Sequence, residues 1–203
     1  DFSKEKFKMN LKSNKVNVIK ILPGGVVTAK DTAEIELDAN GEFVRNPEVD
    51  LVKVAVVERH QGTGNVACGF LKGYGIKEGA VALSVAHDSH NIIVVGVNDE
   101  EMEFAVNSLI EQEGGIVLVK EGKVIESMPM PIAGLMSDQS GEWVDQKLTD
   151  IHEKAYEELG ICGDVEPVMT LCFMSLAVIP EIKLTDMGLF DVTTFSFIPV
   201  EVE

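Results

Sequence analysis

Three runs of branched apolar residues most constrain the fold of this 203-residue chain. The densest, residues 51–57, reads Leu-Val-Lys-Val-Ala-Val-Val, and similar runs follow at residues 80–86 and 92–97. β-Branched side chains favour strands, and runs without polar alternation are typical of strands buried on both faces. We therefore expect a central sheet that other elements cover on both sides.

Helix and turn signals place further elements after these runs. Asn98 with Glu101 predicts a helix start, and Ser140 predicts the start of a second helix. Glu121-Gly122 between two apolar runs predicts a hairpin. The order strand, helix, strand, hairpin, helix indicates an α+β (mixed α/β) fold with two main helices. The expected buried face of the first helix consists of Met102, Ala105, Val106, Leu109 and Ile110.

The N-terminal portion has a different pattern. Residues 1–50 predict short antiparallel strands, with Asn40-Gly41 as a two-residue hairpin turn because both positions accept positive φ. We expect these residues to be one unit and residues 51–203 to be the α/β domain. The apolar run at 168–179 is too short to span a bilayer, and we expect a buried strand or core segment there.

Charge and cysteine content argue against some classes of binding partner and favour one cellular compartment. The chain has 34 acidic and 17 basic residues and a formal net charge of -17. Binding to nucleic acid or to an anionic membrane needs clustered Lys and Arg, so both partners are disfavoured. Three widely spaced cysteines without a CxxC pair favour a reducing compartment, and we expect a cytoplasmic protein. The first residue is not Met, which suggests a piece of a longer protein.

Two polar clusters border the core strands and are the candidate site. The first follows residues 51–57, and the second separates the runs at 80–86 and 92–97. Hydrogen-bonding side chains beside buried strands need partners, either within the protein or in a bound ligand. They form either a site that offers imidazole and carboxylate groups to a ligand or a tight turn that bonds its own backbone. The clusters consist of Glu58, Arg59, His60 and of His87, Asp88, Ser89, His90, Asn91.

A glycine motif offers a competing interpretation as a dinucleotide-binding domain. Residues 62–67 read Gly-Thr-Gly-Asn-Val-Ala after a strand, in outline the dinucleotide fingerprint. That motif requires a helix next, and Gly69, Gly73 and Gly75 would each weaken it by about 1 kcal/mol. The dinucleotide interpretation is therefore disfavoured.

Several blocks resemble one known family. Residues 54–60 (Val-Ala-Val-Val-Glu-Arg-His), 84–96 (Ser-Val-Ala-His-Asp-Ser-His-Asn-Ile-Ile-Val-Val-Gly), 131–137 (Pro-Ile-Ala-Gly-Leu-Met-Ser) and 179–186 (Ile-Pro-Glu-Ile-Lys-Leu-Thr-Asp) are similar to the C-terminal domain of bacterial and archaeal adenine deaminases, in the amidohydrolase superfamily. The block at 84–96 is long and specific.

The resemblance implies an enzyme that hydrolyses adenine to hypoxanthine and ammonia. In that family a (β/α)₈ barrel holds manganese or iron, with an H-x-H pair among the ligands. This chain has no H-x-H, so no metal ligand or certain catalytic residue is carried over, and we expect no metal here and no activity of this chain alone.

Residues 1–50 would then be the junction with the barrel of the same polypeptide, and the resemblance also implies a homo-oligomer. Our hypothesis is that the two polar clusters face the barrel mouth and cover adenine. The alternative is a stand-alone purine-binding or regulatory module without catalysis.

Overall fold

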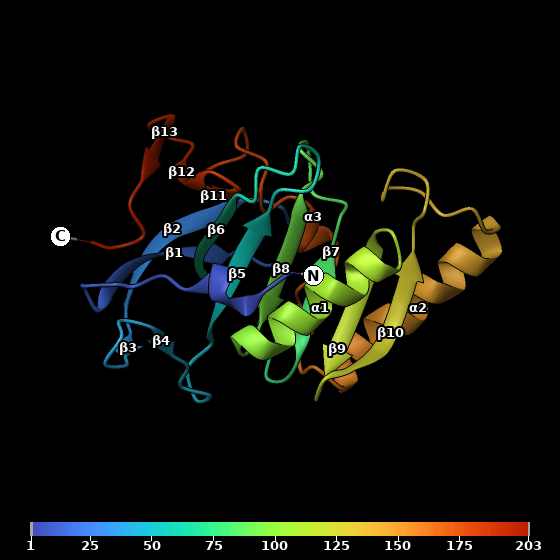
Figure 1. Ribbon diagram of the computed structural model, residues 1–203, viewed down its shortest axis with the longest axis horizontal. Helices are drawn as coiled ribbons and strands as arrows, with labels where there is room; N and C mark the ends of the chain where they lie inside the picture. The colour runs from blue at the N-terminus through green and yellow to red at the C-terminus, as the bar shows by residue number, and fades with distance from the viewer. Residues whose placement is uncertain (1, 203) are drawn as a thin grey trace.

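The computed structural model describes residues 2–202, which form a layered α+β structure around one large sheet (Figure 1). The elements in chain order are η1 (Lys4–Phe7), β1 (Lys15–Ile21), β2 (Thr28–Glu34), β3 (Glu36–Leu37), β4 (Phe43–Val44), β5 (Leu51–Val57), β6 (Val66–Lys72), β7 (Ala80–Leu83), β8 (Ile92–Gly96), α1 (Asp99–Glu111), β9 (Gly115–Lys120), β10 (Lys123–Pro129), α2 (Gly141–Glu157), α3 (Met169–Cys172), β11 (Ile182–Thr185), β12 (Gly188–Asp191) and β13 (Ser196–Ile198).

Within these residues the large sheet has eight strands in the order β10-β9-β7-β8-β5-β6-β1-β2. Strands β1 and β6 run parallel, and the other neighbouring pairs are antiparallel. Strands β11, β12 and β13 form a second, small sheet, and β3 pairs with β4. The α+β prediction is confirmed, and α1 and α2 are its two main helices.

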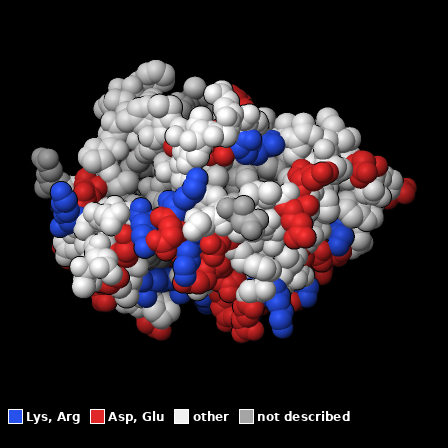
Figure 2. Space-filling model, in the orientation of Figure 1, with Lys and Arg blue, Asp and Glu red and all other residues white. Residues whose placement is uncertain are grey.

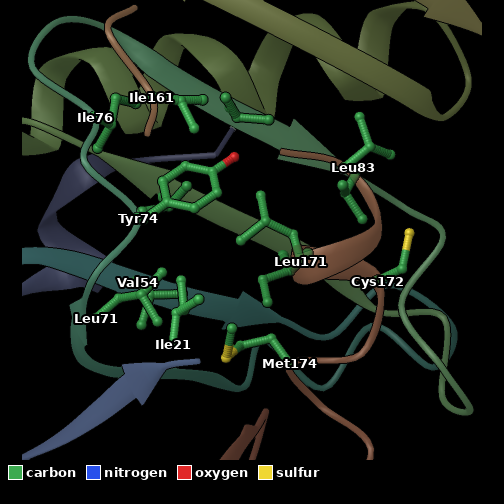
Figure 3. Close-up of a cluster of buried hydrophobic side chains, with 14 of the residues drawn as sticks. Ile21, Val54, Leu71, Tyr74, Ile76, Leu83, Ile161, Leu171, Cys172 and Met174 are labelled. Atoms are coloured by element: carbon green, nitrogen blue, oxygen red, sulfur yellow. The ribbon is translucent and has the colours of Figure 1, made fainter. Parts of the chain in front are cut away.

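Strand β5 is buried along its whole length because helices and strands cover both faces of the sheet. Val54 and Val56 belong to a core shared with α2, α3 and the small sheet, whereas Ala55 and Val57 face the core under α1. Figure 3 shows Tyr74 within the first core, where its hydroxyl donates to the Pro167 carbonyl at 2.8 Å. The apolar side chains on both faces of β5 are thus explained by two hydrophobic layers.

The predicted helix starts and the second hairpin are confirmed. The Asn98 side chain accepts a hydrogen bond from the Glu101 N–H at 2.8 Å, and Ser140 accepts one from the Trp143 N–H at 3.3 Å. Glu121 and Gly122 join β9 to β10 with φ of 52° and 66°. Among residues 2–202 no helix has the length and apolarity needed to cross a membrane.

Two local predictions were wrong, and one alternative of a third was confirmed. The hairpin of β3 and β4 has a five-residue loop, because the Asp38 carboxylate accepts the N–H groups of Asn40 and Glu42 and widens the turn. Ile110 is 52% exposed, since the buried stripe of α1 ends at its neighbour Leu109. Residues 168–179 were expected to form either a buried strand or a core segment. They form α3 and turns and contribute Leu171, Cys172 and Met174 to the core, so the core-segment alternative is confirmed.

Candidate functional site at one edge of the sheet

Both polar clusters lie where the strands of the large sheet end, on the same side of the molecule. Antiparallel pairing places Val57, the last residue of β5, opposite Ile92, the first residue of β8. Likewise Leu83 at the end of β7 pairs with Ile116 at the start of β9. The segments 58–65, 84–91 and 130–139 therefore emerge side by side, near the top of Figure 1. We call them the three rim loops.

Arg59 connects the three rim loops. Its Nε donates to the His90 carbonyl at 2.6 Å, and its Nη2 donates to the Ala133 carbonyl at 2.8 Å. A Cβ on Gly134 would lie 3.0 Å from the guanidinium, so only a residue without a side chain permits this close approach. Burial lowers the pKa of Arg59, but a guanidinium remains charged at neutral pH. Arg59 therefore holds loop positions through main-chain atoms.

Two further hydrogen bonds join the first and second rim loops. His60 Nε2 lies 2.6 Å from the Ser89 carbonyl oxygen, and because a carbonyl only accepts, Nε2 is the protonated nitrogen. The buried side chain of Asn91 accepts from the Arg59 main-chain N–H at 3.3 Å. His60 and Asn91 thus help to fix the relative position of the loops.

Glu58 organises its own loop. Its carboxylate accepts from the main-chain N–H groups of His60 at 2.5 Å, Gln61 at 2.6 Å and Thr63 at 2.9 Å, and from the Thr63 hydroxyl. Hydrogen bonds to a carboxylate favour its charged form, so those from Gln61 and Thr63 lower the pKa of Glu58 to about 2. A carboxylate with these partners and this pKa is poorly suited to act as a general base at neutral pH.

The imidazoles of His87 and His90 lie together at the outer part of the second rim loop. Their ring centroids are 5.5 Å apart, and the His87 ring stacks on Phe173 at 4.8 Å with an interplanar angle of 27°. His87 is also fixed by its main-chain N–H, which donates to the Cys172 carbonyl at 2.8 Å. One face of the His87 ring is therefore covered by Phe173.

His90 combines an unusual backbone with an unsatisfied nitrogen. Its φ is 52°, and its Nδ1 is buried without a hydrogen-bond partner. Burial, followed by electrostatic repulsion from the neighbouring His87 and Arg59 side chains, lowers the pKa of His90. A neutral imidazole can accept a proton or hydrogen-bond a heteroaromatic ligand at physiological pH.

The remaining two predicted residues, Asp88 and Ser89, are exposed. Asp88 Oδ1 lies 3.8 Å from His87 Nδ1. All eight predicted residues therefore occur in the first two rim loops, but they divide into two groups. Glu58, Arg59, His60 and Asn91 hold the loops through side-chain hydrogen bonds, whereas His87, Asp88, Ser89 and His90 lie at the outer part of the rim.

Sequence reasoning missed two residues that support the site. Ser84 has no exposed surface, and its hydroxyl accepts from the Gly115 N–H at 2.8 Å while donating to the Gly134 carbonyl at 2.6 Å. It thereby fixes the third rim loop, and its signal was a lone hydroxyl at the end of an apolar strand. The second residue, Phe173, gave no comparable signal because it lies in a different apolar run.

The dinucleotide-binding interpretation does not fit the structure. The glycine motif is followed by strand β6, so the helix N-terminus of a dinucleotide site is absent from residues 62–72. Across residues 2–202, no three His, Cys, Asp or Glu side chains are grouped as a metal site requires. The fourth histidine, His152, lies on α2 and pairs with Glu166.

A groove of about 1110 Å³ opens beside the first rim loop, between that loop, η1 and α1. Glu58 and Arg59 line one side, and Asn107 and Ile110 of α1 line the other. Its lining includes none of residues 87–91. The histidines therefore lie on a different part of the edge from this groove.

The fold places this chain among the α+β domains, and its distinguishing feature is the polar rim in which Arg59 contacts all three rim loops. Residues 25–196 match the family model described as the adenine deaminase C-terminal domain, and the chain is a member of that family. The expected resemblance is confirmed.

Curated relatives agree with this assignment. Adenine deaminase 2 of Desulfotalea psychrophila is 68% identical over 201 residues, which cover 99% of this chain and 35% of the relative. Adenine deaminases of Ligilactobacillus salivarius and Bacillus subtilis are 48% and 44% identical, covering 100% and 98% of this chain and 35% and 34% of the relatives. This chain thus spans about a third of the length of the curated relatives that it matches.

Proposed function

We propose that this chain is the C-terminal region of a metal-dependent adenine deaminase, which hydrolyses adenine to hypoxanthine and ammonia in the cytoplasm. The support is the match to that family and the 35% of the first relative that the chain covers. The described residues of this chain do not fit the metal that the family implies. The proposal therefore assigns manganese or iron to a barrel of the same polypeptide, where it would supply the water nucleophile.

The role proposed for this chain is to cover the substrate with the three rim loops. The carrying observation is the pair of hydrogen bonds from Arg59 to the His90 and Ala133 carbonyls, because it brings the loops into one surface. The His90 ring is partly exposed on this surface, and a neutral imidazole there is suited to hydrogen-bond a purine nitrogen or the departing amine. Closing loops also exclude water from the reacting atoms.

The same proposal makes residues 1–50 the junction with the barrel and residues 51–203 the α/β domain. Residues 1–50 supply β1 and β2, and β2 is an edge strand of the large sheet. In this proposal the barrel lies next to that edge. Nothing favours the alternative of a stand-alone purine-binding module over this proposal.

The test compares histidine variants of the full-length polypeptide in adenine turnover, followed by absorbance. His87→Ala and His90→Ala should each lower kcat at least tenfold while circular dichroism stays unchanged. His152→Ala is the matched control, because this imidazole pairs with Glu166 on another part of the surface, and it should retain full activity. Unchanged kinetics in both rim variants would make the rim loops structural.

A second measurement concerns this chain alone. After loading with manganese it should show no conversion of adenine, because the proposed reaction needs the barrel. Clear turnover by the 203-residue chain would overturn the division of labour, because the chemistry would then lie within this chain.

A further inference from the structure

The outer face of the small sheet carries an aromatic patch that the site does not use. Phe195 and Phe197 are 73% and 53% exposed, and Met187, beside them in the β11–β12 turn, is 72% exposed. Phe190 lies beneath and makes edge-to-face contacts with Phe195 at 5.3 Å and with Phe197 at 5.2 Å. Met187, Phe190, Phe195 and Phe197 are called the aromatic patch below.

The aromatic patch is held in place by β-pairing and by ring contacts. Phe190 pairs with Phe197 across β12 and β13, so their side chains share one face of the small sheet. A Cβ on Gly188 would lie 3.6 Å from the Phe197 ring, which therefore also rests on that glycine. Rings held this way lose little conformational freedom when a partner covers them, and such residues contribute strongly to binding at interfaces.

The patch is uncharged in a protein that is otherwise strongly acidic. Residues 187–200 contain one acidic residue and no Lys or Arg, whereas the chain carries 34 acidic and 17 basic residues. That residue, Asp191, is buried and accepts hydrogen bonds from Thr193 and Lys30. In Figure 2 the surface over β12 and β13, at the upper left, is almost free of charged side chains. A protein domain that covers this patch would therefore remove few charged groups from water.

The aromatic patch also adjoins the rim loops. Asp186, next to Met187, accepts a hydrogen bond from the Asn65 side chain at 3.5 Å, and Asn65 ends the first rim loop. In Figure 1 the small sheet and the rim loops lie along the same upper border of the molecule. A protein domain that contacts the rim loops would therefore also reach the aromatic patch.

We propose that the aromatic patch is the docking surface for the part of the same polypeptide that carries the barrel. This inference rests on the proposed function, in which the rim loops face the barrel mouth. Its occupant is favoured over a second copy because the relatives are almost three times as long as this chain, which covers 35% of the first. Exposed contiguous apolar patches of this kind mark surfaces that another body covers.

The experiment measures the rate at which a thiol is alkylated at this surface. Phe195→Cys is made in the 203-residue chain and in the full-length polypeptide, and modification is followed peptide by peptide, which separates it from Cys68, Cys162 and Cys172. Val124→Cys is the matched control, because this exposed apolar residue lies near the start of β10, at the opposite end of the strands from the rim loops. Circular dichroism checks that each variant is folded.

Alkylation of the Phe195→Cys variant should be at least tenfold slower in the full-length polypeptide than in the short chain, while Val124→Cys reacts equally in both. Equal rates for Phe195→Cys would overturn the proposal. Protection in the short chain that grows with protein concentration would also overturn it, since the occupant would then be a second copy. The readout needs no catalysis, so a failure of the proposed function appears separately in adenine turnover.

Discussion

Replacing Lys183 by Met should stabilise the protein at pH 7. Lys183 lies on β11 with 0% exposed surface, and its Nζ donates to the Val26 carbonyl at 2.9 Å. Burial lowers its pKa from 10.5 to about 8. Met has a similar length and carries no charge, so it fills the same space without the desolvation cost of an ammonium group.

The size of the effect follows from the pKa. Each tenfold change in the ionisation constant corresponds to about 1.4 kcal/mol, so the charged ammonium costs about 3 kcal/mol at pH 7. The variant loses the hydrogen bond to Val26, which is worth about 1 kcal/mol. We expect Lys183→Met to raise the free energy of unfolding by about 2 kcal/mol.

This gain should depend on pH in a defined direction. The folded pKa lies below the unfolded value, so between pH 8 and 10.5 the unfolded chain binds more protons at Lys183 than the folded chain does. The wild-type protein therefore gains stability relative to the variant as the pH rises. The advantage of Lys183→Met should fall to about zero by about pH 10.

Urea unfolding followed by circular dichroism at several pH values between about 7 and 10 measures the difference. Lys20→Met, an exposed lysine on β1, is the matched control and should change the free energy of unfolding by less than about 0.5 kcal/mol at pH 7. The reasoning is refuted if Lys183→Met destabilises the protein at pH 7, or if its effect does not change with pH.

Two further predictions concern backbone geometry and the first rim loop. Gly79→Ala should lower the free energy of unfolding by about 3 kcal/mol, because at φ 67° its Cβ would lie 1.9 Å from the Val119 carbonyl oxygen. Gly122→Ala, with φ 66° and open space around it, should lose only about 1 kcal/mol in the same urea assay, and equal losses would contradict the steric argument. Glu58 has a depressed pKa, so its ordering of the loop is present above its unfolded pKa of 4.5 and is lost as the pH falls through about 2. In Glu58→Gln the Gln61 and Thr63 amides should exchange hydrogen faster at neutral pH while those of α1 do not, and an unchanged rate would remove this role.

Local features of the fold were predictable because they depend on nearby residues. The buried strand β5 followed from its valine-rich run, and the starts of α1 and α2 followed from Asn98 and Ser140. The strand order was not predictable, since β1 pairs in parallel with β6 across about fifty residues and no local pattern encodes that pairing. Ile110 was misjudged because helical spacing alone does not define the width of the buried stripe.

For the candidate site, the sequence predicted the polar clusters but not the division of tasks within them. Glu58 looked like a site carboxylate, but the structure directs it to the N–H groups of its own loop. The contact of Arg59 with Ala133 joins residues 74 positions apart, which no spacing rule anticipates. The adjacency of the first two loops was expected from strand ends, and the antiparallel pairing of β5 with β8 provides it.

The way Arg59 holds the rim has a consequence for how the surface can diversify. Both hydrogen bonds of its guanidinium end on main-chain carbonyls, which every amino acid supplies. Side chains at His90 or Ala133 can therefore be exchanged during evolution without removing the atoms that position the loops. The two contacts of Arg59 thus constrain the path of the main chain at these two positions but not the identity of the side chains there.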